Sequence, residues 1–119
     1  MIMRNFASAL IVTIATAPSI VALPLASARA EDPPVFRVEL KDGTIAPMRL
    51  EVPANRDIKL EVVNSGTTPV EFESKELRKE KVLAPGTTSS IVIRALKPGE
   101  YQFFDEFHPD AGNAVLVAK

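Results

Sequence analysis

The sequence contains no cysteine and no tryptophan, and its 119 residues include only one histidine and one tyrosine. Without cysteine the chain forms no disulfide, so its fold must rest on packing and hydrogen bonds alone. The same absence excludes a cysteine nucleophile, a zinc–thiolate site and any copper centre that needs a thiolate ligand. A single histidine, His108, with no nucleophile elbow also leaves a conventional hydrolase with little support.

Charge argues against a nucleic-acid partner. The chain has 14 basic and 15 acidic residues, and the basic residues form no patch. All the acidic residues lie after residue 30, where only twelve basic residues remain, so this part has a net charge of −3. A mildly acidic domain suits cations better than anions.

The first thirty residues have the pattern of an export signal. One basic residue, Arg4, precedes an apolar stretch, and the segment ends in Ala28-Arg29-Ala30, an A-x-A cleavage pattern. Two prolines interrupt the stretch and make it a poor transmembrane helix. We therefore expect residues 1–30 to be a removed signal peptide rather than a retained anchor, and residues 31–119 to form one periplasmic domain that does not span the membrane.

Apolar residues alternate with polar ones through most of the remaining chain. In Val35–Lys41, for example, Phe36, Val38 and Leu40 share one face of an expected strand. Turn signals separate such segments about every ten residues, which predicts an all-β Greek-key sandwich or barrel of about seven strands. The expected strands lie within Val35–Lys41, Met48–Pro53, Ile58–Asn64, Val70–Ser74, Ser90–Leu96, Leu96–Phe104 and Ala114–Lys119.

One segment, Ser74–Lys81, has a helical composition and predicts at most one short helix, with Ser74 as its cap and Leu77 facing inward. Its charged residues are typical of a solvated face or a docking surface. By alternation Met48 belongs to the core. The aromatic residues are expected to serve packing: Phe72, Tyr101, Phe103, Phe104 and Phe107.

Four stretches together resemble the cupredoxin family: "RLEVPANRDIKLEVVNSGTTPVEF", "LAPGTTSSIVI", "LKPGEYQFF" and "GNAVLVAK". They cover nearly all of residues 35–119 in the order and spacing of that family. The chain looks most like cysteine-free, cupredoxin-like proteins that accompany bacterial ferrous-iron uptake systems. The resemblance implies a periplasmic role in handling or oxidising iron or copper, beside an inner-membrane iron permease and a second periplasmic metal protein.

The same resemblance implies where a metal would bind. In copper cupredoxins a Cys ligand follows Tyr-x-Phe-Phe, and a His ligand comes soon after; here Asp105 and His108 stand in these places. An earlier His ligand would fall near Glu71, and the final Met ligand is missing, so a type 1 blue-copper centre is not expected. We predict a carboxylate-rich site for iron or copper with Asp105 and His108 at its centre and Glu71, Glu73 or Glu106 completing it.

Plainer interpretations stand beside this prediction. A lone His in a polar loop is commonly solvent-exposed, and Asp105 can serve as a loop residue that caps backbone amides. Glu71 and Glu73 can belong to a solvated strand face. The whole domain can be a cupredoxin scaffold without metal that docks a permease or another partner. A homodimer would supply ligands that a single chain lacks.

Overall fold

The computed structural model describes residues 3, 9–24 and 31–119. It divides the chain into Met1–Ala30 and Glu31–Lys119, and the fold described below is that of the second unit. The signal-peptide features at Arg4 and Ala28–Ala30 lie outside the described residues, so the removal of this segment stays a prediction. Among the described residues, no helix has the length and apolar character needed to cross a membrane.

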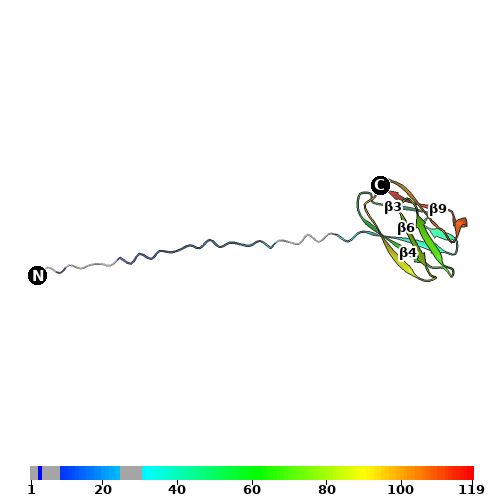
Figure 1. Cartoon of the computed structure of the whole chain (residues 1–119). Coiled ribbons are helices and arrows are strands. Elements are labelled where there is room, and N and C mark those ends of the chain that lie inside the picture. The colour runs from blue at the N-terminus through cyan, green and yellow to red at the C-terminus, as the bar shows by residue number, and fades with distance from the viewer. Residues whose placement is uncertain (1–2, 4–8, 25–30) are drawn as a thin grey trace. The chain divides into compact units, whose positions relative to one another are not determined.

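Residues 31–119 form nine β-strands in two sheets and one short 3-10 helix (Figure 1). The strands are β1 (Val35–Lys41), β2 (Thr44–Ala46), β3 (Arg49–Val52), β4 (Ile58–Asn64), β5 (Val70–Ser74), β6 (Lys79–Leu83), β7 (Thr88–Ile93), β8 (Gly99–Asp105) and β9 (Asn113–Ala118), with the helix η1 at Pro109–Ala111. The predicted all-β class is therefore confirmed, although two strands more than expected are present in this part of the chain.

The first sheet has the strand order β2-β1-β4-β7, and the second has the order β3-β9-β8-β5-β6. Each sheet contains one parallel pair, β1 with β4 and β3 with β9, among antiparallel neighbours. The chain crosses repeatedly between the two sheets, as in a Greek-key sandwich, while the antiparallel pairs β1–β2, β5–β6 and β8–β9 each stay within one sheet.

The core lies between the two sheets and follows the period of two. Val38 and Leu40 of β1 and Leu60 of β4 are fully buried from one side. Phe72 of β5 and Phe103 of β8 meet them from the other side, with ring centroids 5.3 Å apart. Because the chain has no disulfide, burial of these apolar side chains supplies the main driving force for folding.

The predicted helix at Ser74–Lys81 is wrong, because this segment forms the turn of the β5–β6 hairpin. Residues 75–78 make the turn, with Arg78 at φ 54°, and β6 then pairs with β5 in antiparallel register. The Ser74 hydroxyl does accept a hydrogen bond from Leu77 N at 3.2 Å, and Leu77 packs against the core. The capping prediction was locally correct, but strand pairing outweighs the weak helical preference of so short a segment.

The sequence interpretation missed strands β2 and β6 and misplaced one core residue. Met48, predicted to lie in the core, is 45% exposed. It precedes β3, and only its backbone carbonyl takes part in the sheet, where it accepts a hydrogen bond from Val115 N. Strand β2 is only three residues long and follows a two-residue turn, Asp42-Gly43, with positive φ at both positions. So short a strand shows too little alternation to be recognised.

Candidate functional site

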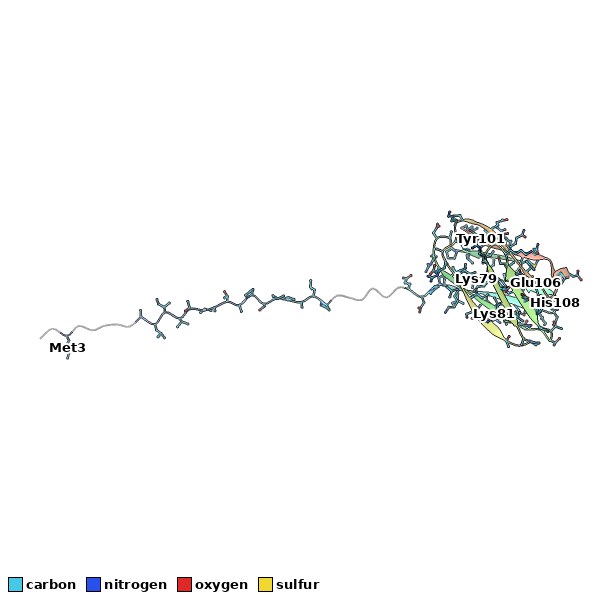
Figure 2. The ribbon with its side chains drawn as sticks, viewed as in Figure 1. Met3, Lys79, Lys81, Tyr101, Glu106 and His108 are labelled. Carbon is cyan, nitrogen blue, oxygen red and sulfur yellow. The ribbon has the colours of Figure 1, made fainter. Side chains whose placement is uncertain are left out.

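Three connections meet at one end of the sandwich: the β1–β2 turn, the β4–β5 loop and the β8–β9 loop. Asp42 of the turn accepts hydrogen bonds from Thr67 N and Thr68 N of the second connection, each at 3.0 Å. Thr68 in turn contacts His108 of the third connection. Figure 2 shows His108 and Glu106 together at this end, away from Tyr101.

The buried side chain of Asn64 holds the β4–β5 loop in place from the side of the core. This side chain is fully buried; its amide donates to Thr68 O and Leu83 O, and its carbonyl accepts from Gly66 N. Gly66 lies so close to the turn that a Cβ there would be 2.6 Å from Asp42 Oδ1 and 2.9 Å from Asp42 N. The loop and the turn can therefore dock only because residue 66 has no side chain.

Asp105 is buried at the end of β8, whereas the sequence interpretation treated it as a loop residue. Its side chain is 0% exposed, because Asp105 pairs in register with Phe72 of the neighbouring strand. One carboxylate oxygen accepts from Glu71 N at 3.0 Å and from Phe107 N at 3.1 Å, and the other is 2.7 Å from His108 Nδ1. The interpretation of Asp105 as a residue that caps backbone amides thus describes its contacts.

Three glutamates lie beside this pair, on the outer face of the second sheet. Glu71 and Glu73 come from β5, and Glu106 is the first residue after β8. Each offers one carboxylate oxygen within 4.8 Å of the other two, and we name this set the acidic group. The backbone bond from Glu106 N to Glu71 O, at 2.9 Å, brings the two segments together.

The acidic group is electrostatically strained. Partial burial, and then repulsion from Glu106 and Glu80, raise the pKa of Glu71 above its ordinary value. Contact with the Glu106 carboxyl raises the pKa of Glu73, with burial and further repulsion adding to it. Oε2 of Glu73 is buried without a hydrogen-bond partner among the described residues. A cation or a proton would relieve this arrangement.

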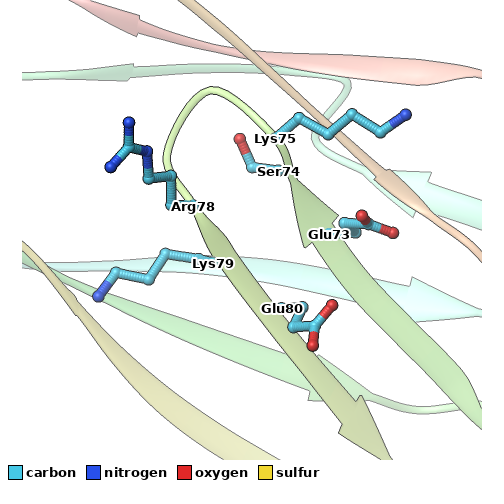
Figure 3. Close-up of a pocket in the computed structure, with 6 residues that line it drawn as sticks. All are labelled: Glu73, Ser74, Lys75, Arg78, Lys79 and Glu80. Atoms are coloured by element: carbon cyan, nitrogen blue, oxygen red, sulfur yellow. The ribbon is translucent and has the colours of Figure 1, made fainter.

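Glu80 extends the acidic surface onto β6, where its Cα pairs with that of Glu73. Figure 3 shows the carboxylates of Glu73 and Glu80 on the same side of the β5–β6 hairpin, with Arg78 and Lys79 pointing away from them. A hollow of about 300 Å³ lies here, lined by both glutamates and by residues of the hairpin turn. The sequence interpretation places Glu80 in a charge run that is either a solvated face or a docking surface.

Of the five predicted metal ligands, the structure therefore brings three into one group: Glu71, Glu73 and Glu106. Asp105 and His108 contact each other but do not join that group among the described residues. Sequence reasoning did not single out Thr68, which contacts His108 from a connection far away in the chain, or Asp42, which accepts a hydrogen bond from Thr68. Only the turn residues of "KDGT" and "SGTTP" mark these connections, and such residues carry no information on which loops meet.

Comparisons with known proteins agree with this fold. The family model described as "Cupredoxin-like domain" matches residues 7–118. An uncharacterized protein of Rickettsia prowazekii (strain Madrid E) is 35% identical over 81 residues, which span 68% of this chain and 65% of that protein, so the match leaves about a third of the relative uncovered.

Two solved structures are similar at low sequence identity. Auracyanin B matches with a TM-score of 0.62 at 18% identity, over 76% of this chain and 92% of its own. The metal-binding domain of the Streptococcus pneumoniae Cu(I)-exporting P-type ATPase CopA, solved with Cu(I), matches with a TM-score of 0.59 at 9% identity, over 71% and 84%. At these identities the likeness shows a shared fold alone.

Proposed function

Because the chain belongs to the cupredoxin-like domain family, which is related to copper-binding proteins, we propose that it is a periplasmic metal-binding accessory protein of a ferrous-iron uptake system. Iron or copper would be its cargo, held at the acidic group. The observation that carries this proposal is the approach of the Glu71, Glu73 and Glu106 carboxylates to within 4.8 Å of one another.

The residues at the position of the cupredoxin copper site do not fit a copper centre with a thiolate ligand. The chain has no cysteine, and both oxygens of Asp105, which stands in the place of that ligand, already accept hydrogen bonds. The acidic group lies next to this position, on the outer face of the sheet.

An all-carboxylate group selects its cation by hardness. Oxygen ligands suit iron or cupric copper, whereas cuprous copper prefers sulfur. Closely spaced anionic oxygens also stabilise a higher charge on the ion, so ferric iron is favoured over ferrous. A protein of this kind would assist ferrous oxidation by an external electron acceptor.

The exposure of the acidic group supports transfer of the bound cation to a partner protein rather than storage of the cation. Glu106 is exposed, whereas Glu71 and Glu73 are partly buried. A partner can therefore reach the cation from the Glu106 side. We propose an inner-membrane iron permease and a second periplasmic metal protein as these partners, on the basis of the resemblance alone.

The contacts of His108 favour a second candidate function. Both ring nitrogens of this side chain already have protein partners, Asp105 and Thr68, so the only imidazole of the chain is engaged without a metal. A cupredoxin scaffold that binds a permease or another periplasmic protein, and no metal, would have this feature as well.

Titration calorimetry of the full chain, with ferrous iron under anaerobic conditions and separately with cupric ion, distinguishes the two candidates. We expect stoichiometric binding that Glu73→Gln weakens, because this variant removes one charge with little change of shape. Glu76→Gln is the matched control, since Glu76 is exposed in the adjacent turn and outside the acidic group. If the wild-type chain binds neither ion, the metal function fails and the scaffold function replaces it.

A further inference from the structure

Asp105, His108, Thr68 and Asp42 form a continuous chain of polar contacts between the three connections. Asp105 Oδ2 lies 2.7 Å from His108 Nδ1, His108 Nε2 lies 3.1 Å from Thr68 Oγ1, and Thr68 Oγ1 lies 2.7 Å from Asp42 Oδ1. The chain runs from a buried end to an exposed end, because the Asp105 side chain is 0% exposed and that of His108 is 23% exposed, whereas Thr68 and Asp42 are exposed. We name these four residues the brace.

The acceptors at the two ends of the brace fix where its protons lie. A carboxylate can only accept, so His108 Nδ1 donates to Asp105 and the Thr68 hydroxyl donates to Asp42. His108 Nε2 faces the Thr68 hydroxyl. Both ring nitrogens of His108 therefore have protein partners, and a metal ion at Nε2 would have to displace Thr68.

The brace ends at the backbone of the acidic group. Asp105 Oδ1 accepts from Glu71 N at 3.0 Å, and the next peptide, Glu106 N, donates to Glu71 O at 2.9 Å. Asp105 thus holds the β5 backbone beside the start of the β8–β9 loop. The spacing between the carboxylates of Glu71 and Glu106 depends on this clamp.

We propose that Asp105 and His108 are positioning residues for the acidic group and do not bind the cation themselves. Asp105 sets the relative position of Glu71 and Glu106, and His108 holds the Asp105 carboxylate in its orientation. This inference rests on the proposed function. The two residues that stand in the places of the family's Cys and His ligands would then hold the neighbouring acidic group in position.

Two substitutions at one position separate positioning from ligation. Asp105→Asn keeps an oxygen that accepts from Glu71 N and Phe107 N, whereas Asp105→Ala removes it. For a positioning residue, we expect cupric-ion affinity to fall about 10- to 100-fold in the Ala variant and to stay within about threefold of wild type in the Asn variant. Asp110→Ala, an exposed acid in the same loop, is the control and leaves affinity unchanged.

Electron paramagnetic resonance of the cupric-loaded full chain gives an independent readout, because His108 is the only histidine. We expect no imidazole nitrogen coupling. A coupling that disappears in His108→Gln, or an Asp105→Asn variant as weak as Asp105→Ala, would overturn the proposal while leaving metal binding intact.

Amide hydrogen exchange of the metal-free chain keeps the inference testable when no ion binds. Protection of the Glu71 and Phe107 amides should be lost in Asp105→Ala and kept in Asp105→Asn. Failure of the wild type to bind either ferrous or cupric ion overturns the proposed function. Unchanged protection in Asp105→Ala overturns the positioning role, whichever way the binding experiment turns out.

Discussion

Two groups of polar residues, the brace and the acidic group, lie side by side at one end of the domain. They differ in whether their polar atoms have hydrogen-bond or ion-pair partners. The brace alternates acceptors and donors, and each of its oxygen and nitrogen atoms described above has a partner. The acidic group contains three carboxylates with no basic partner among the described ion pairs, and one of its oxygens is buried without any hydrogen bond.

This difference distinguishes polar residues that stabilise the fold from polar residues that are arranged to bind a ligand. A satisfied network stabilises the fold, so its loss should cost stability. An unsatisfied group of like charges opposes folding and is retained where a ligand completes it. The residue types alone do not make this distinction, because both groups consist largely of acids.

The largest effect is expected when the brace loses its buried end. Asp105→Ala leaves Glu71 N, Phe107 N and the His108 ring without their acceptor, and should lower the free energy of unfolding by about 3 kcal/mol or more. Denaturant titration measures this. Asp110→Ala, which removes an exposed acid of the same loop outside the acidic group, should change stability little. Equal losses in both variants would contradict the comparison.

A second way to break the brace is to separate the loop from the turn. Gly66→Ala puts a Cβ 2.6 Å from Asp42 Oδ1 and 2.9 Å from its backbone nitrogen, so turn and loop must move apart, at a cost of about 2–3 kcal/mol. Thermal unfolding would report the loss. Gly86→Ala meets no atom within 4 Å and suffers only from its positive φ, at a cost of about 1 kcal/mol.

Removing charge from the acidic group should have the opposite sign. Glu73→Gln relieves repulsion with Glu106 and Glu71, so the metal-free protein should become more stable while cation affinity falls. Unfolding curves recorded in a chelating buffer, and again with cupric ion present, check both halves of this expectation. Glu76→Gln should change neither the stability of the metal-free protein nor its cation affinity. A destabilised Glu73→Gln protein would show that the acidic group is not strained.

The smallest effects should appear in the pH profile of stability. The pKa values of Glu71 and Glu73 are raised in the folded state. Their protonation therefore contributes to the free energy of unfolding in full below about 4.3, the ordinary glutamate pKa, and this contribution is lost as pH rises through the raised values.

Asp42 titrates in the other direction. Hydrogen bonds from the Thr68 side chain and Thr67 N lower its pKa, so its contribution is present above about 3.9 and is lost as pH falls further. Stability measured from pH 7 downward should first rise and then fall. Glu71→Gln with Glu73→Gln should remove the rise, and Asp42→Asn should weaken the fall. A monotonic wild-type profile would contradict the assignment.

The sequence predicted the strands whose alternation is long enough to read, such as Val35–Lys41 and Ile58–Asn64, and the family they form. It could not predict the partners of His108. Thr68 lies 40 residues away, and the contact depends on how two loops dock. The burial of Asp105 was missed because the predicted strand ended at Phe104; once β8 extends to Asp105, the period of two places its side chain on the inward face with Phe103. Glu71 and Glu106 were recognised as candidates, but only the sheet reveals that they meet without His108.

The position of β9 has a consequence for how the chain comes to be folded. This last strand of the sequence lies between β3 and β8 in the interior of its sheet. Until residues 113–118 have emerged from the ribosome, β3 has no partner in that sheet and the core lacks Leu116. The domain therefore completes its folding only when residues 113–118 are available to fill the gap between β3 and β8.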